Sequence, residues 1–329
     1  MSFRFSPAWW PLLAVASPLI APWLFVKNRQ FKKDREDVVT INRNRMDQTE
    51  PLEIPELDFL DLTVVVEWKA REGFIGDAGV SYLFKTDLGS MMYDIGFGPT
   101  RPALSHNAAR LGIDLNQVDA LTISHLHCDH MGGIHAQRSR KVTVPENLMP
   151  AEIKDCYLPD RAEAEGFKTR LVEKPQLLAA GIASSGPLAR RLFIMGFTEE
   201  QALLARIKDK GLVVFTGCGH PTIEVVLEMV RRLSNEPIYA LGGGLHFPVT
   251  DGRGNRAGIK FQTFIGTGKP PWERINDKDL DRTISAINTA GPKEVYLSAH
   301  DTCDYALDRM KKELNAETRV LEAGAVYRF

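Results

Sequence analysis

The stretch "TISHLHCDHMGGI", residues Thr122 to Ile134, places three histidines and one aspartate within six consecutive positions. The whole chain has only eight histidines in 329 residues, so their concentration here is unusual. The stretch overlaps the end of "VDALTIS" (residues 118–124), which has the composition of a buried strand. Imidazole and carboxylate groups are common ligands of Zn²⁺, Fe²⁺ and Mn²⁺. The sequence therefore predicts a metal site where this strand ends.

The spacing inside the stretch favours two ions rather than one. His125 and His127 are two positions apart in an extended segment, so their side chains point the same way and can bind one ion. Asp129 and His130 follow where the chain turns at "MGG", and they can face a second ion. Two ions can bridge a water and lower its pKa towards about 7, which makes a hydroxide nucleophile at neutral pH.

Three further histidines each follow an apolar strand later in the chain. His220 comes after "LVVFTGCG", His246 after "IYALGGGL" and His300 after "EVYLSA". Polar residues at the ends of strands are frequently those that form active sites. His246 is predicted either to bind a metal directly or to hydrogen-bond to a metal ligand. His106 is expected on a helix surface, and His135 is expected outside the site.

The remaining pattern indicates an α/β fold. A strand over residues 60–70 and a hairpin over 81–95 come first, and helices and strands then alternate to the C-terminus. Sheets covered by helices on their outer faces would satisfy this order. Helices are predicted over 100–114, 199–211, 222–235, 278–291 and 304–315, with strands over 118–124, 212–217, 237–243, 294–300 and 325–329.

Composition excludes some classes of function. The chain is 44% hydrophobic and 25% charged, with a net charge of −1, which is typical of a globular protein and gives no reason to expect a nucleic-acid partner. The four cysteines form no CxxC pair, so neither a zinc ribbon nor a thioredoxin-type motif is predicted.

The N-terminus differs from the rest of the chain. "AWWPLLAVASPLIAPWLFV" (Ala8–Val26) is 19 residues without a charge, which is about the length of a membrane span. Five of the next nine residues are basic, whereas one arginine precedes the run, so the body is expected on the cytoplasmic side. We predict a transmembrane anchor over 1–26, a linker or arm over 27–60 and a catalytic domain over 61–329. A cleaved signal peptide and a buried or interfacial helix are the alternatives.

HxHxDH followed by single histidines after later strands resembles the metallo-β-lactamase superfamily. The resemblance covers most of residues 61–329 and implies an αββα sandwich with a di-metal site at the edge of its two sheets. The stretches "GVSYLFKT", "NAARLGIDLNQVDALTIS", "ASSGPL", "KGLVVFTGCGHP", "ALGGGLHF" and "SAHDTC" occur in this order. They are similar to the branch that includes 7,8-dihydropterin-6-methyl-4-(β-D-ribofuranosyl)-aminobenzene-5′-phosphate synthase and related metal-dependent hydrolases.

The resemblance implies roles for particular residues. His246 stands where most members carry a bridging aspartate, as in this branch, and Asp94 of "YDIG" resembles the buried aspartate that orients the histidine loop by hydrogen bonding. The branch usually ends in His-Cys-Thr-Gly, whereas here the chain reads "HDTC" with an extra acid, Asp301, and this departure leaves the substrate open. The implied ligands are His125, His127 and His220 for the first metal, and Asp129, His130 and His300 for the second.

The leading hypothesis is a di-metal hydrolase in which a metal-bridged hydroxide attacks a small phosphorylated or ester-type substrate, with Asp129 and His246 as catalytic residues. Two divalent cations are expected, zinc first, with iron and manganese as alternatives. A lactone or thioester hydrolase, or a membrane-tethered ligand-binding sensor with a structural metal site, are the alternatives, and the oligomeric state is open. Residues 141–210 have room to form a lid, in which Arg190 and Arg191 are predicted either to bind an anion or to be a solvated pair. Residues 251–271 are predicted to form a second rim loop.

Overall fold

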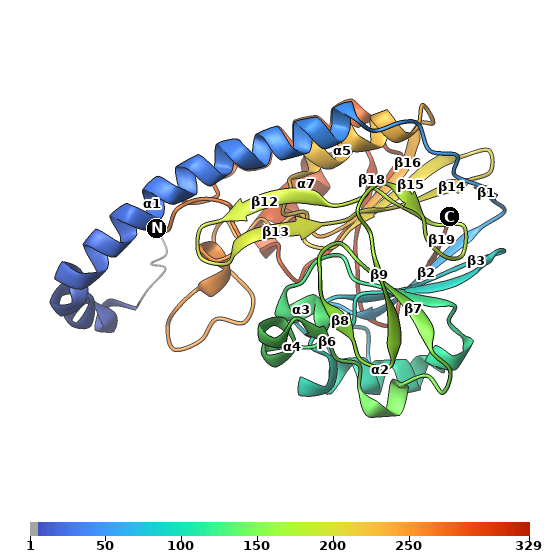
Figure 1. Ribbon diagram of the computed structural model, residues 1–329, viewed down its shortest axis with the longest axis horizontal. Coiled ribbons are helices and arrows are strands. Elements are labelled where there is room, and N and C mark those ends of the chain that lie inside the picture. Colours follow the sequence, from blue (N-terminus) through green and yellow to red (C-terminus); the bar gives the residue numbers. More distant parts are fainter. Residues whose placement is uncertain (1–5) are drawn as a thin grey trace.

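Two mixed sheets face each other in the computed structural model, which describes residues 6–329 (Figure 1). The first sheet has seven strands in the order β19-β2-β3-β4-β5-β7-β9. Its β19 to β4 half is antiparallel and its β4 to β9 half is parallel. The strands are β2 (Leu60–Val66), β3 (Ser81–Thr86), β4 (Gly89–Tyr93), β5 (Ala120–Thr122), β7 (Lys154–Leu158), β9 (Phe167–Leu171) and β19 (Val326–Arg328).

The second sheet has eight strands, with β10-β11-β14-β15-β16-β17-β18 in order and β1 paired with β14. The strands β15 to β18 are parallel, so their carboxyl ends meet at one edge of the sheet. These strands are β1 (Glu56–Leu57), β10 (Gln176–Leu177), β11 (Ala183–Ser184), β14 (Leu203–Ile207), β15 (Gly211–Thr216), β16 (Ile238–Gly243), β17 (Glu294–Leu297) and β18 (Glu317–Val320).

Helices cover the outer face of each sheet, which completes the predicted αββα sandwich. Tyr82, Phe84 and Phe215 fill the space between the sheets, with ring centroids 5.2–6.5 Å apart. The helices are α2 (Ala103–Leu111), α3 (Cys128–Met131) and α4 (Ile134–Ser139) on the first sheet, and α5 (Ile223–Leu233), α6 (Asp277–Ala290) and α7 (Asp304–Glu313) on the second. Two small sheets pair β6 (Lys141–Val142) with β8 (Glu163–Ala164), and β12 (Leu188–Leu192) with β13 (Gly196–Glu200).

The helix predicted over residues 199–211 is wrong. This segment contains the end of β13 and the whole of β14, which pairs antiparallel with β15. Leu203 and Ala205 face the space between the sheets, whereas Leu204 faces the helices on the outer side. A strand buried on both faces is apolar without alternation, and such a run cannot be distinguished from a helix by its period.

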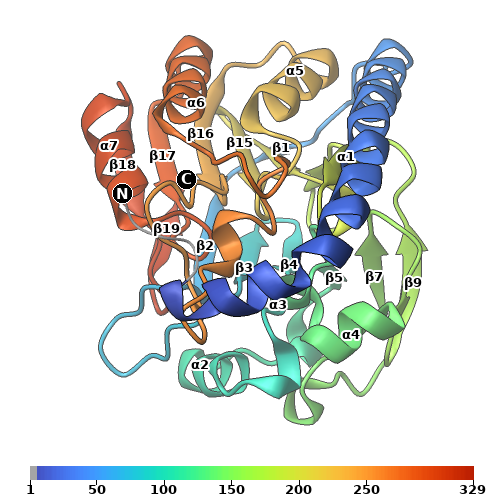
Figure 2. The ribbon, with the colours of Figure 1, turned by 90° about the vertical axis from the view of Figure 1, so that its left-hand side faces the viewer.

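The N-terminal helix α1 (Trp10–Asp47) has 38 residues and follows a short 3₁₀ turn, η1 (Pro7–Trp9). It runs through residue 26 without a break, so the predicted boundary between anchor and linker is not a boundary in secondary structure. Pro18 and Pro22 lie inside the helix, and Figure 2 shows that the helix bends in this half. Its apolar half is long enough to cross a membrane and is not buried in the body.

The second half of α1 lies along the hairpin β12–β13. Phe31, Val38 and Met46 are buried, and Phe31 contacts the ring of Phe193 with centroids 5.2 Å apart. The side chain of Asn42 donates to the Ala189 carbonyl at 2.9 Å and accepts from the Ala189 N–H at 2.8 Å. Residues 27–47 are therefore part of a helix held against the body by apolar packing and paired hydrogen bonds.

Candidate active site

The stretch from Thr122 to Ile134 forms the floor of the site. β5 ends at Thr122, and the chain continues through His125 and His127 into the one-turn helix α3. Gly132 then turns the chain at φ +110°, and a Cβ there would lie 2.5 Å from the Thr143 carbonyl oxygen. Because only glycine fits this turn, "MGG" folds the histidines back towards the second sheet.

The carboxyl ends of β15, β16 and β17 bring the other histidines to the same place. His220 Nε2 lies 3.1 Å from His127 Nδ1, and His125 completes this group of three. A second group contains Asp129, His130 and His300. The structure thus brings together all seven predicted ligands, in the grouping that the family resemblance implied, and His246 lies beside His220 with ring centroids 5.0 Å apart. The seven are His125, His127, Asp129, His130, His220, His246 and His300.

Cys218 lies at the centre of these groups, and sequence reasoning did not identify it. Its Sγ atom is 3.1 Å from His130 Nε2 and 3.2 Å from His300 Nε2. It can join either the Asp129, His130 and His300 group or a group with His220 and His246. The signal in the sequence is its place in "GCGH", two residues before a predicted ligand.

Several buried imidazole nitrogens in the site have no protein partner. His125 Nε2 and both ring nitrogens of His246 are buried without a hydrogen bond to any described residue. Burial lowers the pKa of His127 to about 3 and of His246 to about 4, so both rings are neutral at pH 7. Neutral imidazoles with free lone pairs are the form that binds divalent metals, and a buried polar atom without a partner costs about 1–3 kcal/mol. The donor set therefore fits metal ions.

Asp94 holds the histidine stretch from behind. It sits at φ +59° after β4 and accepts hydrogen bonds from the Ser124 N–H at 2.6 Å and the Ser124 hydroxyl at 2.7 Å. Its Oδ2 also accepts from Nδ1 of His130 at 2.7 Å, which directs Nε2 of that ring towards Cys218. Burial opposes charge on His130, but the carboxylates of Asp94 and Asp129 raise its pKa to about 9.

Two buried carboxylates, which were not predicted from the sequence, accept hydrogen bonds from the loops that follow β15 and β17. Glu200 accepts hydrogen bonds from the backbone N–H groups of residues 217, 218, 219 and 220 at 2.8–3.0 Å. Glu67 accepts from Tyr82 at 2.8 Å and from the N–H of Ala299 at 3.2 Å, and it also bonds the hydroxyl of Ser298, which lies 2.6 Å from His300 Nδ1. Burial raises the pKa of each carboxyl to about 7.

Asp301, the extra acid after His300, is also buried at the site. It accepts a hydrogen bond from the His246 N–H at 3.0 Å. Its Oδ2 lies 3.8 Å from His300 Nε2 and 3.9 Å from His246 Nδ1. It therefore fixes the backbone of the loop that presents His246, which sits at a positive φ of 54°.

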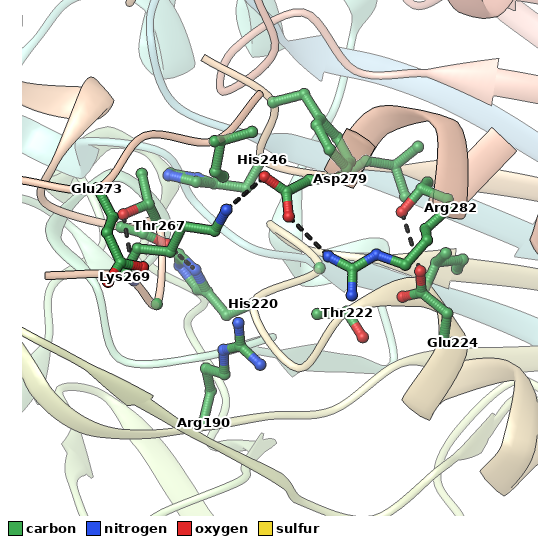
Figure 3. Close-up of a pocket in the computed structure, with 18 of the residues that line it drawn as sticks. Arg190, His220, Thr222, Glu224, His246, Thr267, Lys269, Glu273, Asp279 and Arg282 are labelled. Carbon is green, nitrogen blue, oxygen red and sulfur yellow. Dashed lines mark hydrogen bonds and ion pairs between the residues drawn. The ribbon is translucent and has the colours of Figure 1, made fainter. Parts of the chain in front are cut away.

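A cleft of about 450 Å³ opens from His220 and His246 (Figure 3). The rim loop predicted over residues 251–271 forms one wall, where the Gly266 carbonyl accepts from His220 Nδ1 at 3.2 Å. Arg190 of β12 lines the cleft, whereas Arg191 does not and instead pairs with Asp34 of α1 at 3.0 Å. The other charged lining residues are Arg35, Glu224, Lys269, Glu273, Asp279 and Arg282.

Comparisons with known proteins agree with this geometry. Residues 75–232 match the model of the metallo-β-lactamase superfamily. The chain is 22% identical over 295 residues to 7,8-dihydropterin-6-methyl-4-(β-D-ribofuranosyl)-aminobenzene-5′-phosphate synthase of Methanocaldococcus jannaschii, covering 78% of this chain and 91% of that protein. The crystal structure of a metal-dependent hydrolase of the β-lactamase superfamily superimposes with a TM-score of 0.58 at 21% identity, over 82% of this chain and 98% of the other. The chain therefore carries a domain of the metallo-β-lactamase superfamily, with its hydrolase-type fold.

Proposed function

We propose that the protein is a di-metal hydrolase that acts on a phosphate ester. One observation carries this proposal: imidazole groups from four strand ends converge on one point, and the buried nitrogens of His125 and His246 have no partner among the described residues. The first ion would be held by His125, His127 and His220. The second would be held by Asp129, His130 and His300, with Cys218 beside both groups and His246 beside His220. Zinc is the metal that this mixture of imidazole, carboxylate and thiol groups favours, with iron and manganese as alternatives.

When bound, the two cations would supply an activated water and neutralise the charge that develops on the substrate's oxygens. Asp129, whose side chain is 21% exposed, is the least buried of the carboxylates that face the cluster and would accept the proton of the attacking water. The neutral ring of His246 would hydrogen-bond to a substrate oxygen at the mouth of the cleft. The water oxygen forms the new bond to phosphorus, the ester bond breaks, and the leaving oxygen takes up the proton.

The charges of the cleft favour an anionic substrate. Arg35 and Arg190 form no ion pair with any described carboxylate, whereas Lys269 and Arg282 both pair with Asp279. Two guanidinium groups that lack a protein anion are suited to bind phosphate oxygens. The Methanocaldococcus relative is named for a 5′-phosphate compound, which supports the same class.

Metal analysis followed by a substrate screen tests the proposal. We expect two equivalents of metal per chain and hydrolysis of phosphodiesters such as bis-p-nitrophenyl phosphate, with loss of activity on chelation and recovery on addition of Zn²⁺. Lactones and thioesters serve as the comparison substrates. Turnover of lactones without turnover of any phosphate ester would show that the protein is a lactonase instead. If the metal-loaded protein hydrolysed none of the three substrate classes, the proposed hydrolase function would be overturned.

We also propose that α1 attaches the protein to the membrane, with the body on the cytoplasmic side. The apolar half of α1 is exposed and is followed by the basic segment 27–35. Trp9 Nε1 donates to the Ala257 carbonyl at 3.0 Å, and Ser6 N–H donates to the Gly258 carbonyl at 2.9 Å. A helix that keeps these contacts lies along the membrane surface, whereas one that spans the bilayer must release them.

Cell fractionation and labelling would separate these topologies. We expect the full chain in the membrane fraction and its body digested only when protease reaches the cytoplasmic side. A Ser6→Cys variant labelled from outside the cell would indicate a spanning helix, and labelling only from the cytoplasm would indicate an interfacial one. Recovery of a shortened, exported chain would show a signal peptide and contradict the proposed localisation.

A further inference from the structure

The membrane-attachment helix also contributes to the cleft. Arg35 of α1 lines the same cleft as His220 and His246. It lies nine residues after Val26, the end of the uncharged run, which corresponds to about 13 Å along a helix axis. The headgroup layer on each side of a bilayer is roughly 5–8 Å thick, so if α1 leaves the hydrocarbon core at Val26 this wall of the cleft lies within about 10 Å of the layer where lipid phosphates are found.

A chain of aromatic and basic contacts joins the apolar helix to the rim of the cleft. The ammonium group of Lys27 lies 4.8 Å from the ring centroid of Trp23 and 5.7 Å from that of Phe193. Phe193 in turn contacts Trp272, with ring centroids 5.5 Å apart. Trp272 is 54% exposed and directly precedes Glu273, which lines the cleft. Exposed tryptophans beside a lysine are typical of residues at a membrane interface.

The rim loop meets the apolar helix at its other end. The contacts of Ser6 and Trp9 described above fall on residues 257 and 258 of this loop. Figure 2 shows the N-terminal half of α1 crossing this end of the molecule, in front of the loop. In the arrangement that the structure shows, the apolar segment therefore contacts the rim loop through Trp9, and its Trp23 is linked to Phe193 through Lys27.

Arg190 is placed to bind a charged group inside this cleft. The side chain packs against Gly268 of the rim loop, where a Cβ would lie 2.5 Å from its Nε atom. It points towards His220 and has no hydrogen bond or ion pair to a described residue (Figure 3). Burial, and then the neighbouring charge of Arg35, lower the pKa of Arg190 to about 10. An anion beside both guanidinium groups would remove this repulsion.

We propose that the substrate is an amphiphile that stays in the membrane: its phosphate enters the cleft beside Arg190 and Arg35, and its hydrocarbon tail remains in the bilayer next to Trp272. This inference rests on the proposed phosphate-ester function and names its substrate class. The ester bond to be hydrolysed would then lie between Arg190 and the metal ligands His220 and His246.

The test compares ligands that differ only in their tails. The full-length protein is loaded with Zn²⁺ and placed in phosphatidylcholine nanodiscs, and binding of methylphosphonate and hexadecylphosphonate is measured by calorimetry. We expect hexadecylphosphonate to bind at least about 10-fold more tightly, because burial of apolar surface adds to the shared anion contacts. Arg190→Gln should weaken both ligands by about 10-fold or more, since charge-assisted hydrogen bonds are lost. Trp272→Ser should weaken only the tailed ligand.

Matched controls and turnover separate the outcomes. Arg170→Gln, which changes an exposed arginine on β9, and Ile153→Ser, which removes an exposed apolar side chain just before β7, should leave both affinities unchanged. Equal binding of the two phosphonates, unaffected by Trp272→Ser, would show a free soluble phosphate as ligand and overturn the inference.

In the same discs, hydrolysis is measured with two esters, methyl p-nitrophenyl phosphate and hexadecyl p-nitrophenyl phosphate. Binding as expected without turnover of either ester would overturn the hydrolase function and leave the binding inference standing.

Discussion

Replacing His127 with alanine is expected to remove about one equivalent of metal per chain and to lower activity by more than about 100-fold. His127 Nδ1 lies 3.1 Å from His220 Nε2, so the two rings share the first predicted ion with His125. Loss of a group that only supports a metal ligand already costs about 10–100-fold in affinity or activity, and loss of a direct ligand should cost more. Metal content by mass spectrometry and kcat/KM on a phosphodiester measure the two effects.

His135→Ala is the matched control, because it removes another histidine of the same segment. His135 lies in α4, five positions after His130, and its side chain is exposed. This variant should keep both metal equivalents and full activity. A His127→Ala protein that retained its metal and its activity would be incompatible with a di-metal hydrolase at this site.

The positions of the metal-ligand candidates could be predicted because the relevant information is local. His125 and His127 share a face through their spacing of two, and His220, His246 and His300 each follow an apolar strand. Parallel strands of one sheet deliver their carboxyl ends to one edge, so strand ends far apart in sequence meet in space. Local spacing and this one topological rule were enough to expect these histidines at one edge, whereas their division between two ions came from the resemblance to the metallo-β-lactamase superfamily.

The supporting acids could not be predicted because their roles depend on non-local placement. Glu200 lies inside the segment 199–211, in which the sequence pattern favoured a helix, but it ends β13, and only the real strand pairing brings it beneath residues 217–220. Glu67 reaches Ser298 and Ala299 across more than 230 positions of sequence. No spacing in the sequence connects such residues, since their contact exists only once both sheets have formed.

The full length of α1 could not be predicted because the composition of the chain changes abruptly within the helix. Residues 27–47 are rich in charge, which suggested a linker or an arm without a defined helix, but Phe31, Val38, Asn42 and Met46 recur at spacings of four and seven and form one buried face. This is the spacing of a helix that packs against a surface. The uncharged run ends abruptly at residue 26, which suggested a boundary there. The helix α1 continues through this position without interruption.

Glu200→Ala is expected to abolish most activity without changing any candidate ligand. The wild-type carboxylate accepts four backbone N–H groups from residues 217–220, the loop that carries Cys218 and His220. Alanine leaves these donors buried without an acceptor, and each such group costs about 1–3 kcal/mol unless the loop moves to water. The loop should therefore shift, and displacement of His220 should lower metal affinity and activity by more than about 100-fold.

Thermal unfolding with and without chelator distinguishes this effect from a general loss of stability. The wild-type protein should unfold at a higher temperature with Zn²⁺ than with chelator, because metal bound only to the folded state stabilises it. Glu200→Ala should lose most of this difference while it remains folded. Glu199→Ala removes the adjacent carboxylate, which pairs with Arg45 of α1 at 2.5 Å, and should keep the full difference. Equal metal-dependent stabilisation in Glu200→Ala and wild type would show that residues 217–220 hold His220 in place without this carboxylate.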